Sequence, residues 1–373
     1  MKQTLRGKTW RLAVAVALVG SVALTACGGG GAKESTADKA PAEEPSLEFT
    51  GPNGEKPESL DQLQLTDEEI AKVQAGQYKA AFVWHESSAL VAATEKGARE
   101  EFEKLGIEVV ASTEAGFDPA RQADNLQSVL ALDPDIIVTI AVDPTSAAAA
   151  FQPAVDKGVK LAVMTTPPAG YTSGDQIVSI VTGALTEYGK ANAEMLGKAI
   201  GGKGQIGYLY HDADFWFTNQ RDQAFKDWTA HLYPDIDIVA EEGFSDPART
   251  EDIANAMITK NPEIKGIYVA WATAAEGVLA ALRQAGRTDV KVVTNDLEAN
   301  LASDMMRDGN VVGIVGNASV DLGRGLAIVG AYGVLGKQAP QMVANPPFAV
   351  TKDNIVEGWK SDYGTEPPAS VTD

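Results

Sequence analysis

The chain has few cysteines, few histidines and far fewer basic than acidic residues, and each shortage excludes a class of protein. Cys27 is the only cysteine, so an intramolecular disulfide is impossible. The 31 basic residues stand against 51 acidic ones, giving a formal net charge of −20. Nucleic acid is therefore not an expected partner, because neutralising phosphates requires clustered Lys and Arg. Such an excess of one charge favours a soluble chain, and we expect a monomer.

A long hydrophobic run is also missing from the start of the chain. The apolar run Leu12–Leu24 has 13 residues, whereas a membrane-spanning helix needs about 20. It follows four basic residues and precedes small ones. A basic start, a short apolar middle and a small-residue end are typical of an export signal, which we assign to residues 1–26.

The sequence LTAC followed by Gly28 resembles the lipobox of bacterial lipoproteins. In those proteins the cysteine is acylated, with palmitate among the acyl chains, and becomes the mature N-terminus. The resemblance implies lipidation of Cys27 and anchoring of the exported chain on the outer face of the cell membrane. Stable anchoring needs more than one acyl chain, and the resemblance implies a multiply acylated cysteine.

Residues 27–76 are predicted to be a tether that ends in a short helix. From Gly28 to about Gln64 the chain is rich in Gly, Pro, Glu, Ser and Lys, a composition typical of flexible segments. In LTDEEIAKVQAG, Thr66 and Glu69 have the spacing of a capping box, and Gly76 suits the helix end.

Beyond Tyr78 short apolar runs alternate with longer segments of helical period. The runs KAAFVW, IEVVAS, DIIVTIA and KLAVMTT, each followed by a polar or amphipathic segment, are typical of parallel strands covered on both faces. The pattern then restarts with QIGYLY, DIVAEE, KGIYVAWA and VKVVTND. This alternation predicts an α/β fold made of two doubly wound, Rossmann-like lobes.

Two near-identical phrases support the idea of two similar lobes. EAGFDPAR occupies Glu114–Arg121 and EEGFSDPAR occupies Glu241–Arg249, each where the second strand of a set turns into its helix. The aspartate in each phrase suits a helix N-cap, and the following proline suits the first helical position.

The last αβ portion is expected to return to the first lobe, which creates a three-strand hinge, a device that allows domains to close around ligands. The predicted lobes are 77–183 plus 318–345 and 184–317 plus 346–360, with 361–373 as a flexible tail. The predicted crossings lie near Thr182–Leu185, Asn317–Val320 and Asn345–Pro347.

Ligands of open α/β sheets bind at the carboxyl ends of the strands. The aromatic residues expected there are Trp84, Phe215, Trp216, Phe244 and Trp271, and the polar ones are His85, Ser88, Thr165, Arg221, Asp296 and Asn317. Flat rings stack on the C–H faces of sugars, and charged groups make strong hydrogen bonds to hydroxyls. The set predicts a site for a polyhydroxylated molecule, without a catalytic residue, metal or cofactor.

The chain resembles the type I periplasmic-binding-protein family, in particular the ribose- and pentose-type sugar-binding subunits of ABC importers. The likeness extends from about Lys79 to Trp359 and includes GAREEFEKLGIEVV, GVLAALRQAG, VVTNDLE and MRDGNVVGIVGN. It implies an ABC permease as partner. It also implies ligand contacts from Arg221 in RDQAF, Phe244 after the next strand, Asp296 in TND and Asn317 at the crossing near Asn317–Val320.

The first lobe departs from the family pattern. Where the family often has Asn-Pro-Phe-Phe after its first strand, this chain has HESSALV, with Ser88 and Leu90. An Asp-Arg pair is replaced by Thr165-Thr166, and an Asn in the second lobe is replaced by Trp271. A polyol, a modified sugar or another small polar solute is therefore an alternative to a standard pentose.

Two other functions are compatible with the sequence. The same fold serves in sensors that present a ligand, for example a quorum signal, to a membrane receptor. His85, His211, Asp212 and Asp214 are residue types that ligate metals, and HES at His85–Ser87 contains hydrolase-type residues, so a metal-dependent hydrolase is the third alternative.

Overall fold

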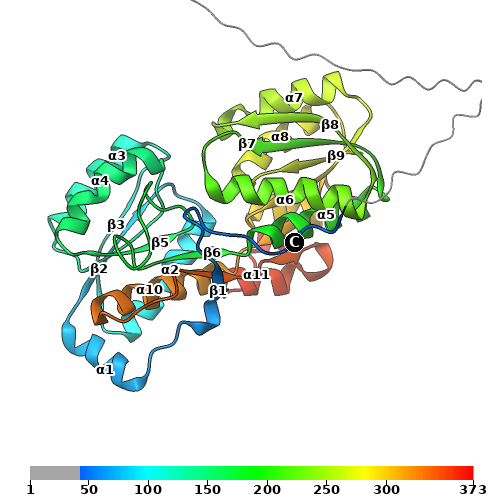
Figure 1. Ribbon diagram of the computed structural model, residues 1–373. Coiled ribbons are helices and arrows are strands. Elements are labelled where there is room, and N and C mark those ends of the chain that lie inside the picture. The colour runs from blue at the N-terminus through cyan, green and yellow to red at the C-terminus, as the bar shows by residue number, and fades with distance from the viewer. Residues whose placement is uncertain (1–42, 373) are drawn as a thin grey trace, which may run out of the picture. The chain divides into compact units, whose positions relative to one another are not determined.

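The computed structural model describes residues 43–372, which form two α/β lobes (Figure 1). Cys27 and the expected export signal lie outside the described residues. Within the described chain, each lobe is built on its own sheet with helices on both faces.

Lobe 1 contains a seven-stranded parallel sheet in the order β1-β12-β6-β5-β4-β2-β3, counted over residues 43–372. Alternate side chains of β2 enter different cores. Phe82 packs with α2 and α10 on one face, and Val83 packs with α3 and α4 on the other. The strands are β1 (Pro57–Ser59), β2 (Lys79–Trp84), β3 (Glu108–Glu114), β4 (Ile136–Thr139), β5 (Lys160–Met164), β6 (Ser179–Gly183) and β12 (Met342–Asn345). The helices are α1 (Asp67–Gly76), α2 (Ala89–Lys104), α3 (Pro119–Leu130), α4 (Pro144–Asp156) and α10 (Ser319–Leu335).

Lobe 2 contains a sheet in the order β13-β11-β10-β9-β7-β8, in which β13 runs antiparallel to β11. Helices α5 and α6 cover one face, and α7, α8 and α9 cover the other. The strands are β7 (Lys203–His211), β8 (Asp235–Phe244), β9 (Ile264–Val269), β10 (Lys291–Asn295), β11 (Val311–Gly316) and β13 (Phe348–Val350). The helices are α5 (Leu185–Ala199), α6 (Trp216–Leu232), α7 (Thr250–Lys260), α8 (Ala272–Gln284) and α9 (Ala299–Met306), with 3₁₀ turns at η1 (Leu60–Gln62), η2 (Pro247–Arg249) and η3 (Lys352–Asn354).

The chain passes between the lobes three times within the described residues: from β6 to α5, from β11 to α10 and from β12 to β13. Each passage takes a few residues at the carboxyl end of a strand. The predicted fold of two doubly wound lobes joined by a three-strand hinge is confirmed.

Residues 43–56, which precede β1, contact both lobes, in contrast to the flexible tether expected there. The carbonyl oxygen of Thr50 accepts hydrogen bonds of 2.9 Å from Trp216 Nε1 and Gln220 Nε2 of α6 in lobe 2. Phe49 is 7% exposed in the core of lobe 1, and β1 pairs with β12. In Figure 1 this segment runs alongside α5 and α6. Although the composition is polar, one buried ring and a paired backbone fix this part of the chain.

The last residues also differ from the flexible tail expected at 361–373. They complete α11 (Ile355–Tyr363) and form the short α12 (Ala369–Thr372). Asp362 is fully buried and accepts hydrogen bonds from Ser319 N at 2.8 Å and from Ser319 Oγ. It therefore satisfies a backbone donor in the first turn of α10, which otherwise has no intrahelical partner. Val371 is buried against lobe 2.

The two copies of the repeated phrase share a cap but differ at the phenylalanine. Asp118 and Asp246 each accept a hydrogen bond from the backbone two residues later, at 2.9 and 3.0 Å. The first copy opens α3 directly, whereas the second opens η2 before α7 begins. Phe117 is 44% exposed with a φ of 61°, whereas Phe244 ends β8 and is 3% exposed. The two copies therefore share the aspartate cap and the proline after it, but not the role of the phenylalanine.

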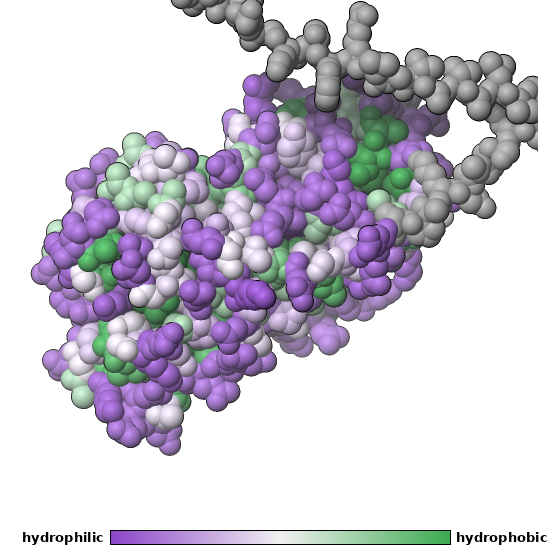
Figure 2. Space-filling model, viewed as in Figure 1, coloured by the Kyte–Doolittle hydropathy of each residue, from purple (hydrophilic) through white to green (hydrophobic). Residues whose placement is uncertain are grey.

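Hydrophilic residues cover most of the face shown in Figure 2. Of the helices placed between residues 43 and 372, none combines the length and the apolar character that crossing a bilayer requires.

Candidate functional site

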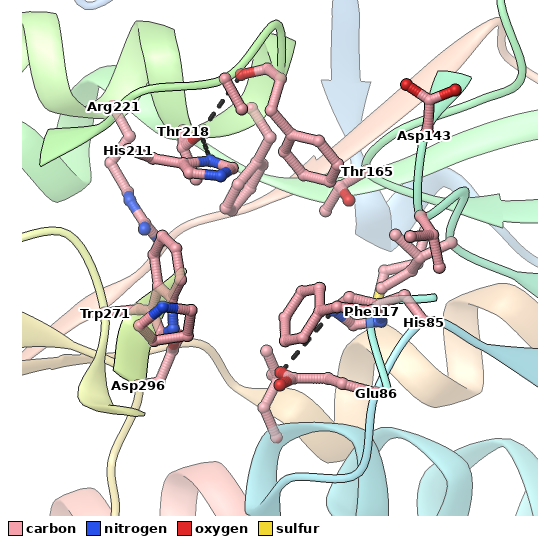
Figure 3. A pocket seen from close by; sticks show the side chains of 18 of the residues that line it. His85, Glu86, Phe117, Asp143, Thr165, His211, Thr218, Arg221, Trp271 and Asp296 are labelled. Carbon is pink, nitrogen blue, oxygen red and sulfur yellow. Dashed lines mark hydrogen bonds and ion pairs between the residues drawn. The ribbon is translucent and has the colours of Figure 1, made fainter. Parts of the chain in front are cut away.

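A cavity of about 560 Å³ lies between the lobes, at the carboxyl ends of both sheets (Figure 3). Lobe 1 lines it with His85, Glu86, Leu90, Gly116, Phe117, Pro119, Ile140, Val142, Asp143, Pro144, Met164, Thr165, Gly183 and Leu322. Lobe 2 lines it with Tyr188, His211, Ala213, Asp214, Phe215, Phe217, Thr218, Arg221, Ser245, Asp246, Pro247, Trp271, Asp296 and Asn317. The volume suits a small ligand, and the position is the one that the strand-end rule predicts.

Arg221 is the cation of the site and is only 2% exposed. It lies in the second turn of α6, where Nη2 donates to the carbonyl oxygen of Ala270 at the end of β9. Its guanidinium stands over the ring of Phe217, 5.0 Å from the centroid. Within residues 43–372, Arg221 Nε has no hydrogen-bond partner, and it lies 3.8 Å from Asp222 Oδ1. A buried donor of this kind needs an acceptor, which an oxygen atom of a bound ligand would supply.

Asp296 directly follows β10 and has a φ of 69°, a left-handed backbone that aspartate tolerates better than most residues. Asn317 Nδ2 donates to Asp296 Oδ1 at 2.9 Å, and Tyr188 OH donates to Asn317 Oδ1 at 2.8 Å. Burial raises the pKa of Asp296, and the positive charge of Arg221 opposes that shift. Because β10 and β11 are neighbours, Asp296 and Asn317 meet at one edge of the sheet.

Trp271 and His211 form an aromatic wall on lobe 2 (Figure 3). Their ring centroids lie 4.9 Å apart and their planes are nearly perpendicular. His211 Nδ1 is 2.8 Å from Thr218 Oγ1. Burial, followed by the charge of Arg221, lowers the pKa of His211 to about 4, so the ring is neutral near pH 7. In the described part of the chain Trp271 Nε1 is buried without a hydrogen-bond partner, which leaves a second free donor.

His85, Glu86 and Phe117 face this wall from lobe 1 (Figure 3). Burial lowers the pKa of His85 to about 4. Burial, helped by the nearby negative charge of Asp296, raises the pKa of Glu86 to about 7. The Phe117 ring lies edge-on to His85, with centroids 5.3 Å apart. Across residues 43–372, His85 Nδ1 is another buried atom without a partner.

Of the eleven residues expected at the strand ends, seven line the cavity: His85, Thr165, Phe215, Arg221, Trp271, Asp296 and Asn317. Thr165 lies one residue past β5, with a φ of 55°. Trp84 does not line the cavity, because it is 1% exposed in the core of lobe 1, where Nε1 donates to Glu95.

The other three predicted residues lie outside the cavity lining. Phe244 packs behind Trp271, with ring centroids 4.7 Å apart, and supports the wall. Trp216 is bound to Thr50 in the N-terminal segment, an interaction that no local pattern predicts. Ser88 caps α2 by accepting a hydrogen bond from Val91 N at 3.3 Å.

The residues that the sequence reasoning missed fall into two groups. Glu86 follows the predicted residue His85 after β2, and Phe117 lies in the first copy of the repeated phrase after β3. Both positions follow a strand, so the strand-end rule applies to them as well. Tyr188, Phe217 and Thr218 lie in the first turns of α5 and α6. The spacing of these three within helices is equally typical of core positions.

Among residues 43–372, no group of three or more His, Cys, Asp or Glu side chains is arranged to hold a metal ion. His211 bonds Thr218, and His85 lies 3.7 Å from Glu86. The arrangement offers hydrogen bonds and ring faces around the cavity.

Comparison with known proteins gives a family and a fold. A family model for the periplasmic binding protein domain matches residues 80–337. A xylitol-binding protein from Mycolicibacterium smegmatis is 27% identical over 250 residues, which cover 65% of this chain and 68% of the relative. A D-apiose import binding protein from Actinobacillus succinogenes is 36% identical over 130 residues, covering 33% of this chain and 38% of the relative.

A solved structure shows the same architecture. An ABC transporter solute-binding protein from Agrobacterium vitis, bound with alpha-D-tagatopyranose, matches 75% of this chain and 96% of its own with a TM-score of 0.68. At 22% identity this likeness concerns the fold. With the family model covering more than half of its length, the chain belongs to the periplasmic binding protein domain family and has the type I fold of two Rossmann-like lobes.

Proposed function

We propose that the chain is the substrate-binding lipoprotein of an ABC importer, which captures a sugar or polyol between its lobes and delivers it to a membrane permease. The observation that carries the proposal is the set of Arg221, Asp296 and Asn317 at the base of the cavity. It combines a buried cation with a free donor, a carboxylate and an amide, next to the ring faces of Trp271 and Phe117.

This combination matches hydroxyl groups, which both donate and accept hydrogen bonds. Carboxylate and guanidinium groups bind a hydroxyl through charge-assisted bonds. The relatives named above are described as binding xylitol and importing D-apiose, both small polyhydroxylated molecules. His211 contacts the hydroxyl of Thr218, which itself donates to the carbonyl oxygen of Phe215. The relatives named above are described as binding and import proteins, which supports binding without turnover.

Closure of the lobes about the three crossings would trap the ligand. The closed form, acting as a monomer, would then dock on the permease. Acylated Cys27 would hold the chain at the outer face of the membrane, near that partner. Replacement of Cys27 by Ser tests this part: acyl labelling and membrane association are expected in the parent chain and are expected to be lost in the variant.

A ligand screen tests the binding function. Thermal shift and tryptophan fluorescence are measured with pentoses, hexoses and linear and cyclic polyols. At least one compound is expected to raise the melting temperature and change the fluorescence, because Trp271 lines the cavity. No response to any of these compounds would contradict the proposal.

A matched pair of variants locates the binding. Arg221→Met removes the buried guanidinium but keeps the length of the side chain, and we expect at least about a tenfold loss of affinity. Arg283→Met removes an exposed arginine of lobe 2 that pairs with Asp304 outside the cavity, and the affinity should stay within about twofold of the parent value. Equal losses of affinity in the two variants would show that the ligand does not bind in the cavity.

A further inference from the structure

The two walls of the cavity differ in chemistry. Lobe 2 supplies the buried ionic and amide groups, Arg221, Asp296 and Asn317, together with His211, Thr218 and the rings of Phe215, Phe217 and Trp271. Lobe 1 supplies a set of apolar side chains that we call the apolar wall. The apolar wall consists of Leu90, Phe117, Ile140, Val142, Met164 and Leu322.

The apolar wall lies where a ligand of this fold is held. Ile140 follows β4 and Met164 ends β5, so both stand at carboxyl ends of strands. Leu90 and Leu322 lie in the first turns of α2 and α10, beside those strand ends. Ile140, Met164 and Leu322 belong to the core of lobe 1, and Leu90 packs against that core. The core of lobe 1 thus continues to the surface of the cavity.

Apart from Thr165, the polar groups of lobe 1 offset little of this apolar character. Asp143 is engaged as the cap of α4, since its Oδ1 accepts hydrogen bonds of 2.7 Å from Ser146 N and Oγ. His85 is uncharged near pH 7, and Glu86 is partly protonated there. Among the described residues that line the cavity, lobe 1 contributes no Lys or Arg.

Phe117 adds exposed apolar surface that faces the cavity. The residue is 44% exposed, although large apolar side chains are normally covered. Its positive φ is uncommon for an aromatic residue and directs the ring toward His85. An apolar group of a ligand that contacts this ring would cover surface that the protein leaves exposed.

We infer that the ligand is amphiphilic: a sugar or polyol whose hydroxylated face binds lobe 2 and whose alkyl, deoxy or thioether substituent packs against the apolar wall of lobe 1. This inference rests on the proposed function and narrows its substrate class. A fully hydroxylated sugar would place hydroxyls against Leu90, Val142 and Met164, where they lose water without gaining a partner. A substituted sugar avoids that cost and gains apolar contact.

Calorimetry with two matched series tests the inference. The first series is D-ribose, 5-deoxy-D-ribose and 5-methylthio-D-ribose, and the second is D-xylose, methyl β-D-xyloside and butyl β-D-xyloside. In at least one series we expect the substituted probe to bind at least about tenfold more tightly than its parent, the usual effect of one added apolar group in a hydrophobic pocket.

The outcomes separate the two proposals. If parent sugars bind and every substituted probe binds equally or more weakly, the inference is wrong and the proposed function stands. If no member of either series binds, both the inference and the assignment to sugars of this size fail.

A matched pair of variants assigns the preference to the apolar wall. Leu90→Asn keeps the size of the side chain and makes it polar, and it should abolish the tenfold preference for the substituted probe over its parent sugar. Leu132→Asn makes the same change at a leucine of lobe 1 that is 44% exposed outside the cavity, and it should keep the preference. A preference that survives in folded Leu90→Asn would overturn the inference.

Discussion

Asn317 Nδ2 donates a hydrogen bond of 2.9 Å to Asp296 Oδ1, which joins the second interlobe crossing to the carboxyl end of β10. Asn317 also accepts a hydrogen bond from Tyr188 OH, whose helix α5 begins at the first crossing. Two of the three crossings are therefore connected to one residue of the site. A ligand that binds Asp296 contacts the hinge through this network.

Replacement of Asn317 by Ala tests the network. Because the change leaves the buried Asp296 and Tyr188 short of partners, we expect the free energy of unfolding to fall by about 1–3 kcal/mol and the ligand affinity to fall about tenfold. Asn255→Ala removes an exposed side-chain hydrogen bond to Gln284 and serves as the control, with little change in either quantity. Chemical denaturation and calorimetry measure the two effects, and an unchanged affinity in Asn317→Ala would show that the network does not support the site.

The two phenylalanines of the repeated phrase should respond in opposite ways. Phe244→Ala leaves a cavity behind Trp271 in the core of lobe 2, so the free energy of unfolding should fall by about 3–5 kcal/mol. Phe117→Ala removes an exposed ring, so stability should change by less than about 1 kcal/mol while the affinity falls. Denaturation curves with ligand titrations separate the two, and a loss of several kcal/mol in Phe117→Ala would contradict the assignment.

Glu86 should make stability depend on pH in a way that a single substitution removes. Its pKa is about 7 in the folded chain against an ordinary value of 4.5, so the folded chain binds more protons than the unfolded chain between these values. The stability contributed by the protonated side chain is present below pH 4.5 and is lost as the pH rises through 7. Across this window Glu86 lowers the free energy of unfolding by up to about 3 kcal/mol.

Glu86→Gln should abolish this loss. The free energy of unfolding of the variant minus that of the parent chain should rise between pH 4.5 and pH 8. His85 and His211, which have lowered pKa values, are present in both chains and largely cancel in this difference. A difference that stays constant over the pH range would show that the pKa of Glu86 is not raised.

The N-terminal segment provides a test of the packing across the lobes. Phe49 is 7% exposed and Leu47 is 43% exposed, only two residues apart. Phe49→Ala should therefore lower the free energy of unfolding by about 3 kcal/mol, whereas Leu47→Ala should change it by less than about 0.5 kcal/mol. Equal and small effects would mean that the segment is loosely held in solution.

The sequence was sufficient for the architecture because the apolar runs and helical segments alternate regularly from Tyr78 onward. The site residues Arg221, Asp296 and Asn317 could also be predicted from the sequence. Each lies after a strand or in the first two turns of a helix, within a recognisable motif. The positions of Phe49 and Asp362 were not predictable in the same way. Each is fixed by a contact with residues far away in the chain, Phe49 with the core of lobe 1 and Asp362 with Ser319. The local composition around them is typical of a loop.

Some residues expected at the strand ends do not line the cavity, and the reason is similar. Strand-end position places Phe244 and Trp84 near the cavity, but the side chains of a strand alternate between its two faces, so neighbouring positions differ in what they reach. Trp216 lies in the first turn of α6, yet its indole binds the N-terminal segment. Sequence position thus identified the edge of the sheet, while the direction of each side chain had to come from the structure.

The structure of the complex with a ligand from the screen tests the central claim most directly. We expect a closed cleft in which the guanidinium of Arg221 and the carboxylate of Asp296 both lie within about 3.2 Å of ligand hydroxyl oxygens. A ligand bound outside the cleft, or inside it without contact to either residue, would contradict the proposal that Arg221 and Asp296 bind the ligand between the lobes.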